Sequence, residues 1–228
     1  MAVPQKMLRW LEMLAVFVGA PLLIWQFDGL LGGPKLFLFL WFMALVCGSV
    51  LLFDKTFNYK KLWNTKQVMP VMGWIVARWV VLAIALTSMF GLLSGRTLPG
   101  LSLPVPTGIF PIFSRGHPLL PLAIFLFYPW VSVYPQNVIY LAFFCQRYRS
   151  ILGGGWGLIL TNAVAFSLAH IMFNNWIVLL LTFVGGIIFT RTYLKSHSLL
   201  LATIEHAMYG LLCLYLCIGV FLLYGASG

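Results

Sequence analysis

Acidic residues are scarce in this sequence of 228 residues: there are four, and charged residues of both signs make up only 8% of the chain. Soluble domains usually have about 25% charged residues, so this composition excludes an ordinary soluble globular protein. Extensive disorder is excluded as well, because 62% of the residues are hydrophobic and 16% are aromatic. Fourteen basic residues stand singly between long apolar runs. This pattern predicts an integral membrane protein in contact with the lipid bilayer, and no nucleic-acid partner.

Recognised redox and metal motifs are also missing. The cysteines form no CxxC pair, and we interpret them as free thiols in or beside apolar segments. They are Cys47, Cys145, Cys213 and Cys217. The HExxH motif is absent, so we predict neither a metal site nor a cofactor. The apolar stretch after Lys6 and Arg9 lacks a small-residue cleavage pattern, and we interpret it as a retained first helix rather than a signal peptide.

Seven apolar segments approach the roughly 20 residues that a spanning helix needs. They cover about residues 8–27, 36–53, 74–94, 118–146, 157–173, 176–190 and 199–225. The fourth is too long for one straight span and contains Pro129 and Pro135, so it is either a kinked helix or a span followed by a short second helix. No repeat and no long linker divides the chain. We predict an all-α polytopic helix bundle of seven or eight transmembrane helices, forming one domain over residues 1–228.

The basic residues predict an orientation. If the N-terminus is cytoplasmic and seven spans alternate, ten basic residues fall inside, and only Lys35, Arg96 and Arg115 fall outside. Arg78 lies near the start of the third span. The inside residues are Lys6, Arg9, Lys55, Lys60, Lys61, Lys66, Arg147, Arg149, Arg191 and Lys195. Residues 95–117, rich in Pro, Gly and Ser, are the longest predicted outer loop, and the glycine run 153–155 is a predicted flexible inner connection.

Polar and ionisable residues inside spans are costly unless they are partnered or functional. Those of interest are Gln136, Asn137, Asn162, His170, Glu205 and His206. At 1.5 Å per helical residue, Asn137, His170 and His206 lie about 15, 21 and 12 Å from the predicted cytoplasmic ends of their spans. Similar depths predict one buried, water-containing pocket in the cytoplasmic half of the bilayer. The alternative is that these groups only form hydrogen bonds between neighbouring helices.

Three short motifs around these residues resemble the CPBP family, the membrane CAAX proteases and bacteriocin-processing enzymes that are also called the Abi family. Residues 166–170 (FSLAH) resemble the FxxxH motif, and residues 205–210 (EHAMYG) resemble the later histidine motif, HxxxN or HxxxD. Residues 134–148 are similar in context to the first motif, EExxxR. The resemblance covers about residues 118–215, with the motifs in the family's order and spacing. It implies the fold of an intramembrane endopeptidase.

The sequence departs from the family at the catalytic positions. Gln136 and Asn137 stand at the glutamate pair, Leu141 stands at the arginine, and Gly210 stands at the final Asn or Asp. A carboxamide cannot accept a proton from water near pH 7, and general-base catalysis is typically worth about 10²–10⁴ in rate. The absence of the arginine is consistent with the absence of the glutamates, because an arginine in lipid without an acidic partner would be an unpaired charge.

The resemblance still implies roles for the two histidines: His170 would help to activate water, and His206 would help to stabilise the oxyanion. Glu205 is a further candidate for acid–base chemistry, with a structural carboxylate as the alternative. Adjacent residues on a helix point about 100° apart, so Glu205 faces a neighbouring helix or the inner surface if His206 faces the pocket. Two aromatic clusters are present: Trp74 with Trp79, and Tyr128 with Trp130 and Tyr134. We interpret them as interface anchors and packing residues, with a substrate-lining role as the alternative.

Three functions remain open from the sequence. The first is a degenerate family member, a pseudo-protease that binds another membrane protein or a membrane-associated peptide. The second is an active intramembrane endopeptidase that cleaves near the cytoplasmic face with His170, His206 and Glu205. The third is a bacteriocin self-immunity or small-solute role. The missing carboxylates favour the first, whereas the two histidines support the second. The short, tail-free members of the family are mostly prokaryotic, which implies a bacterial inner membrane, with a eukaryotic endomembrane as the alternative.

Overall fold

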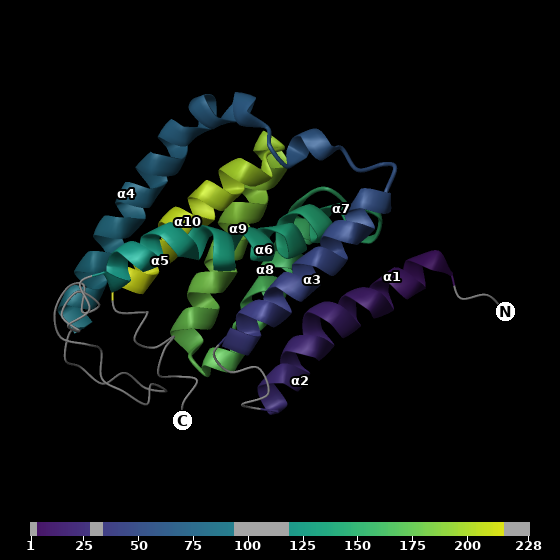
Figure 1. Ribbon diagram of the computed structural model, residues 1–228, viewed down its shortest axis with the longest axis horizontal. Helices are drawn as coiled ribbons and strands as arrows, with labels where there is room; N and C mark the ends of the chain where they lie inside the picture. The colour runs from purple at the N-terminus through teal and green to yellow at the C-terminus, as the bar shows by residue number, and fades with distance from the viewer. Residues whose placement is uncertain (1–3, 28–33, 94–118, 217–228) are drawn as a thin grey trace.

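The computed structural model describes residues 4–27, 34–93 and 119–216 of the chain, and within these ranges all regular structure is helical (Figure 1). Six of the described helical segments are long and apolar enough to cross a membrane, and a shorter apolar helix follows them. The six are Gln5–Gln26, Lys35–Phe53, Thr65–Met89, Pro121–Leu152, Trp156–Phe173 and Trp176–Ser196. The shorter helix is Leu199–Tyr215. The predicted class, a polytopic all-α membrane bundle, is confirmed.

The first span is one helical rod built from α1 (Gln5–Leu14) and α2 (Ala20–Gln26), which a π-helical turn, Ala15–Gly19, joins. The second span, α3 (Pro34–Phe53), is apolar on all its faces, as is typical of a helix in lipid. Two short 3₁₀ turns, Tyr59–Lys61 and Thr65–Gln67, lead from α3 to the next span.

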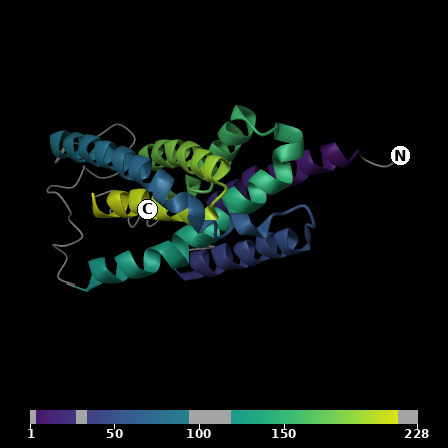
Figure 2. The same cartoon turned by 90° about the horizontal axis from the view of Figure 1, so that it is seen from above.

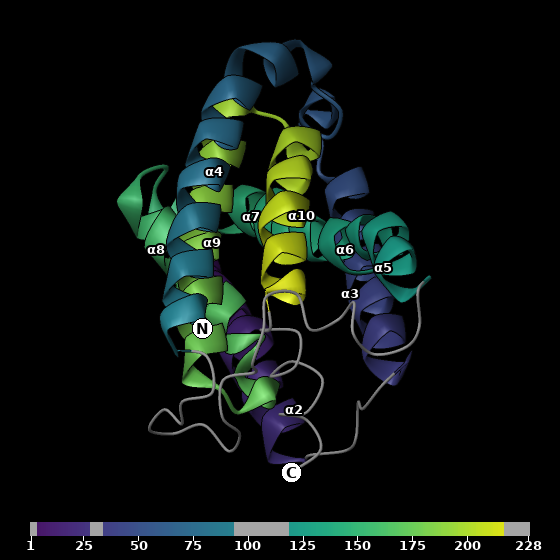
Figure 3. The same ribbon diagram turned by 90° about the vertical axis from the view of Figure 1, so that its left-hand side faces the viewer.

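The third span, α4 (Val68–Leu93), starts six residues before the predicted residue 74. Its early start includes Pro70, which a helix tolerates in its first turn because the backbone N–H there has no intrahelical acceptor. Figures 1 and 3 show α4 along one edge of the bundle, next to α10 (Leu199–Tyr215). Large apolar side chains such as Trp74 and Val81 are exposed on α4, so this helix presents much of its surface to lipid.

The fourth span is a single long rod rather than a span with a separate second helix. It consists of α5 (Leu120–Tyr128), α6 (Tyr134–Asn137) and α7 (Phe144–Leu152). Two π-helical segments, Pro129–Val133 and Val138–Phe143, connect them. Wider turns of this kind accommodate the missing N–H groups and the bulk of Pro129 and Pro135. Figure 2 shows this rod, in teal, crossing the bundle obliquely.

The last three helices are α8 (Trp156–Leu168), α9 (Trp176–Ser196) and α10, and they lie side by side (Figure 1). The α8–α9 pair is tightly packed: a Cβ atom added at Gly186 would lie 2.8 Å from the Cα of Ala163. Next to this contact, the buried Asn162 Nδ2 donates to Thr190 Oγ1 at 2.7 Å. Small residues and a buried polar pair are typical of helix association in membranes.

The connections agree with the predicted turns where the structure describes them. Gly153 has φ +76° and ends α7, and the glycine run 153–155 joins α7 to α8. Asn175 is the N-cap of α9, and its Oδ1 accepts hydrogen bonds from the backbone N–H groups of Ile177 and Val178. The predicted loop at 95–117 lies outside the described residues, as do Asp28 and Cys217.

The basic residues that were predicted to be cytoplasmic gather at one end of the bundle. Arg9 Nη1 donates to the backbone oxygen of Arg147 at 3.1 Å, which ties the start of α1 to the end of α7. Asn64 Nδ2 donates to the backbone oxygen of Ser196, which ties the segment before α4 to the end of α9. We call this end, where residues 55–66 also lie, the basic end. The opposite end contains the end of α2 and the start of α3.

Candidate active site

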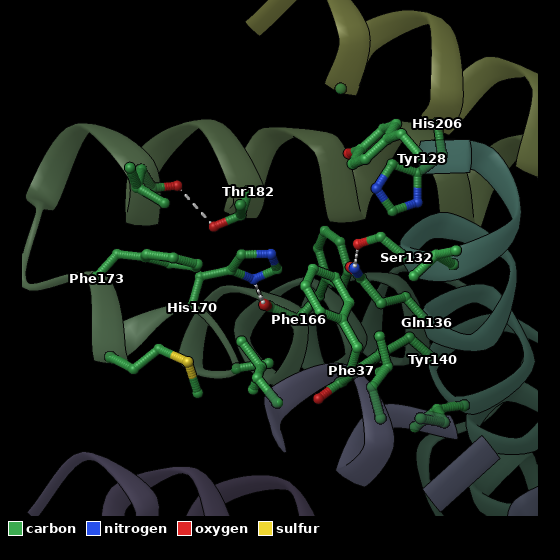
Figure 4. Close-up of a pocket in the computed structure, with 18 of the residues that line it drawn as sticks. Phe37, Tyr128, Ser132, Gln136, Tyr140, Phe166, His170, Phe173, Thr182 and His206 are labelled. Atoms are coloured by element: carbon green, nitrogen blue, oxygen red, sulfur yellow. Dashed lines mark hydrogen bonds between the residues drawn. The ribbon is translucent and has the colours of Figure 1, made fainter. Parts of the chain in front are cut away.

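An apolar cavity of about 780 Å³ lies among α2, α3, α5, α8, α9 and α10 (Figure 4). Its volume is in the range of small-molecule sites, roughly 300–1,000 Å³. Eight polar side chains interrupt its apolar lining: Tyr128, Ser132, Gln136, Tyr140, His170, Thr182, His206 and Tyr209. Residues of α2, the first turns of α3 and Phe173 also line it, so the cavity extends away from the basic end.

His206 projects from α10 into this cavity and stacks on Phe189, with ring centroids 4.4 Å apart. Its Nδ1 lies 2.9 Å from Oδ1 of the buried Asn137. Asn137 Nδ2 donates to Thr203 Oγ1 at 3.0 Å, which leaves Oδ1 as an acceptor. His206 Nδ1 therefore carries the proton of this hydrogen bond, and Nε2 of the neutral ring keeps its lone pair. The tautomer is assigned from the hydrogen-bond network.

His170 follows α8 and is held in a similar way. Its Nδ1 lies 2.8 Å from the backbone oxygen of Phe166, a group that can only accept, so Nδ1 donates and Nε2 has the lone pair. The ring of Phe166 lies between the two histidines, with its centroid 4.9 Å from that of His170 and 5.4 Å from that of His206. Two imidazoles thus face one cavity, one from α10 and one from the turn after α8 (Figure 4).

The depth prediction needs one correction. Asn137 and His206 are in direct contact, at matching heights as expected. His170, however, lies beyond the end of α8, on the side away from the basic end. His170 is fourteen residues after Trp156, about 21 Å along the span, and this distance takes it nearer to the far end of the bundle than Asn137 or His206. The cavity therefore extends beyond the half of the bundle next to the basic end, in which it was predicted to lie.

The other positions of the first motif differ in their surroundings. Gln136 lines the cavity, and its Nε2 donates to Ser132 Oγ at 2.8 Å. Its Oε1 is buried without a hydrogen-bond partner among the described residues. Leu141 is buried in the hydrophobic core and does not line the cavity.

Glu205 is not brought to the histidines. Its side chain is 0% exposed, and Oε1 lies 2.8 Å from Arg78 Nη2 on α4. The same Arg78 nitrogen lies 3.5 Å from Thr192 Oγ1. Glu205 and His206 thus point to different sides of α10, as the 100° rotation between adjacent residues requires. Arg78 is the partner that sequence reasoning missed, although a lone basic residue inside a span was a signal that it needed an acid.

Every described carboxylate is engaged outside the cavity. Arg147 donates twice to Glu12, at 2.7 and 3.0 Å, and Tyr148 Oη also donates to Glu12. Asp54 accepts from both the hydroxyl and the backbone N–H of Thr56, and these hydrogen bonds lower the pKa of the Asp54 carboxyl. Among the residues that the structure describes, no carboxylate lines the cavity, and no three His, Cys, Asp or Glu side chains converge as metal ligands would.

The fold and the site together define a polytopic helical membrane protein with a two-histidine cavity inside its bundle. Residues 118–212 match the family model described as type II CAAX prenyl endopeptidase Rce1-like. The predicted resemblance to the CAAX protease (CPBP) family is confirmed over this segment, which is 95 of the 228 residues. Neither a search of curated proteins nor a search of solved structures finds a match to the chain.

Proposed function

We propose that this protein is a non-hydrolysing relative of the membrane CAAX endopeptidases, and that its cavity holds an apolar segment of another membrane protein or membrane-associated peptide. One observation carries the proposal. At the position where the resemblance places the catalytic glutamate, Asn137 has an amide whose oxygen accepts from His206 and whose nitrogen donates to Thr203. This side chain positions an imidazole and cannot take a proton from water.

The remaining acids do not compensate for this loss. Glu205 is the nearest in sequence to a cavity histidine, but it is bound to Arg78 on the other side of α10. Without a carboxylate base, hydrolysis loses about 10²–10⁴ in rate, and an imidazolium formed during the reaction has no anionic partner in the cavity. The arginine position is likewise occupied by the buried, apolar Leu141. These features support binding over turnover.

The cavity is suited to an apolar ligand. Transfer of one CH₂ group from water to an apolar site is favourable by about 0.8 kcal/mol, although a ligand that arrives from lipid gains less. Shape and the few polar groups must therefore select the ligand. The cavity is lined by rings such as Phe37, Phe166 and Phe173 and carries no formal charge among its described residues (Figure 4). An uncharged, largely apolar peptide segment fits this chemistry.

A second candidate is supported by the two imidazoles. His170 and His206 both line the cavity with Nδ1 already engaged, so in the neutral ring Nε2 is the basic nitrogen, and a neutral imidazole is a competent general base near pH 7. In that case the protein would be a slow endopeptidase in which one histidine activates water. The two candidates make opposite predictions for the same assay.

The basic end is proposed to face the cytoplasm, with the protein in a bacterial inner membrane. The positive-inside bias of the sequence supports this orientation, because the residues that contribute to it share one end of the bundle. Cysteines introduced at Lys60 and at Gln26 test it. A membrane-impermeant reagent should label position 60 only in inverted vesicles and position 26 only in right-side-out vesicles, and the reverse pattern would overturn the orientation.

The functional test uses purified protein in lipid with a panel of quenched, membrane-inserted peptides, and it measures both anisotropy and cleavage. The native chain is expected to bind at least one peptide and to cleave none. Asn137→Glu, Gln136→Glu plus Asn137→Glu, and the latter with Leu141→Arg restore the family's groups stepwise. Cleavage by a restored variant alone supports a binding protein built on a protease fold.

His170→Ala is the matched variant for the second candidate. If the native chain cleaves a peptide and His170→Ala abolishes that cleavage without loss of binding, the protein is an endopeptidase and our proposal is wrong. If no peptide binds to the native chain, the cavity does not serve peptide recognition.

A further inference from the structure

Tyr128 occupies the space that a side chain at position 210 would need. Gly210 lies one helical turn after His206 on α10, and Tyr128 is the last residue of α5, which packs against α10. A Cβ atom added at Gly210 would overlap the hydroxyl oxygen of Tyr128 and would lie 2.7 Å from its Cζ. The glycine therefore allows the phenol ring to lie directly against the helix backbone.

This packing places the Tyr128 hydroxyl beside His206. Residues 206 and 210 are four apart and share one face of α10, and both line the cavity together with Tyr128 (Figure 4). No hydrogen bond of this hydroxyl is seen within the described part of the chain, and Tyr128 is part of the cavity lining. The hydroxyl is available to a ligand in the cavity.

The groups around the hydroxyl define what it can bind. Nε2 of His206 and Nε2 of His170 are acceptors, and Gln136 Oε1 is a buried acceptor without a partner among the described residues. The Tyr128 hydroxyl can donate, and it carries no charge. A ligand that satisfies this set needs an acceptor for the hydroxyl and a donor for an imidazole. A secondary amide has both, in its C=O and its N–H.

We propose that Tyr128 is the hydrogen-bond donor that binds a carbonyl oxygen of an amide in the cavity, in place of the side chain that Gly210 lacks. This inference rests on the proposed function and names the polar group that the cavity recognises. The amide N–H is then placed to donate to Nε2 of His206. One neutral hydrogen bond of this kind corresponds to about three- to tenfold in affinity.

The test uses N-hexadecylacetamide with a ¹³C-labelled carbonyl, added to the full-length protein in phosphatidylcholine vesicles. Infrared spectroscopy reads the labelled carbonyl band, which moves to lower frequency when the oxygen accepts a hydrogen bond. The amplitude of the shifted band against probe concentration gives the affinity. Hexadecyl ethyl ether, which has the chain but no carbonyl and no N–H, competes for the cavity and serves as the control with a weaker acceptor and no donor.

The native protein is expected to give a saturable, shifted band that the ether displaces only at about three- to tenfold higher concentration than unlabelled amide does. Tyr128→Phe keeps the ring but removes the donor, so the band should lose its shift and the amide should bind about three- to tenfold more weakly. Tyr193→Phe is the matched control, because Tyr193 is a buried tyrosine of α9 that does not line the cavity. It should leave the band unchanged.

A double variant places the donor on the other helix. Tyr128→Ala combined with Gly210→Asn removes the phenol and adds a carboxamide at the position it filled, and this pair should recover the shifted band that Tyr128→Ala alone lacks. A native protein that binds amide and ether equally, without a shifted band, overturns this inference and leaves the proposed function intact. A native protein that binds neither overturns both. The native spectrum decides the question even where a variant fails to fold.

Discussion

Substitutions that break the ion pair between Arg78 on α4 and Glu205 on α10 should show how much this pair contributes to the stability of the bundle. Arg78 lies ten residues after the start of α4, so about 15 Å along the span, and its side chain is 44% exposed on the outer surface. Glu205 on the other helix is 0% exposed. Arg78→Leu removes the cation and leaves the carboxylate buried without its partner. Glu205→Gln removes the anion and leaves a neutral amide that can still accept a hydrogen bond.

The difference in burial between Arg78 and Glu205 determines how much each substitution should lower the free energy of unfolding. Removing one partner of a buried pair costs about 3–5 kcal/mol, and the fully enclosed Glu205 puts Arg78→Leu in that range. Glu205→Gln should cost less, about 1–3 kcal/mol, because the half-exposed guanidinium can move its head towards the interface. The double variant has no unpaired charge, so it should be more stable than Arg78→Leu alone. The coupling free energy then exceeds the cost of Glu205→Gln alone, so it is at least about 1 kcal/mol.

Unfolding of the four proteins in bicelles, followed by the loss of a contact between α4 and α10, measures these free energies. Lys66→Gln serves as a control, since Lys66 is an exposed basic residue near the start of α4, and it should change stability by less than about 0.5 kcal/mol. If the costs of the two single variants simply add in the double variant, within about 0.5 kcal/mol, the two charges are not coupled and our account of α4 is refuted.

Three further predictions follow from packing, capping and titration. Gly186→Ala should destabilise the protein by about 1–3 kcal/mol, because its Cβ would meet the backbone of Ala163, whereas Gly73→Ala, with no atom within 4 Å, should be neutral or stabilising; thermal unfolding of both variants checks the difference. Asn175→Ala should cost about 1 kcal/mol by removing the N-cap of α9, and equal stability of the two proteins would contradict the assigned cap. Asp54 has a lowered pKa in the folded protein, so its contribution to stability is present above the unfolded pKa of about 3.9 and is lost as pH falls through the folded value. Asp54→Asn should therefore reduce the acid-side decrease in melting temperature, and an unchanged pH profile would show that the Thr56 contacts do not persist in solution.

Much of the fold was predictable because hydropathy reports directly on lipid contact. The long fourth segment was recognised as irregular from Pro129 and Pro135, since proline removes a backbone donor. The π-helical form of the irregularity was not predictable, because several local geometries can accommodate a proline and the packing of neighbouring helices selects among them. The early start of α4 was missed because the predicted segment began at residue 74, whereas the helix begins at Val68 and has Pro70 in its first turn.

The residues of the candidate site could be predicted from the sequence, but the contacts that they make could not. Cost in lipid singled out Asn137, His170 and His206, and the structure brings all three to one region. The pairing of Arg78 with Glu205 spans 127 residues, and no local spacing rule connects them. The role of Gly210 could not be predicted either, because it depends on Tyr128, which fills the space beside the glycine and is distant in the sequence.

The same ion pair has a consequence for how the chain is made. Synthesis proceeds at about 5–20 residues per second, so the 127 residues from Arg78 to Glu205 take roughly 6–25 s to appear. During that interval α4 is already complete while its acidic partner does not yet exist. Until α10 is made, the guanidinium of α4 has no access to this carboxylate. The ion pair between α4 and α10 is therefore among the last contacts that the described part of the chain can form, and α10 adds its wall of the cavity after the others have been synthesised.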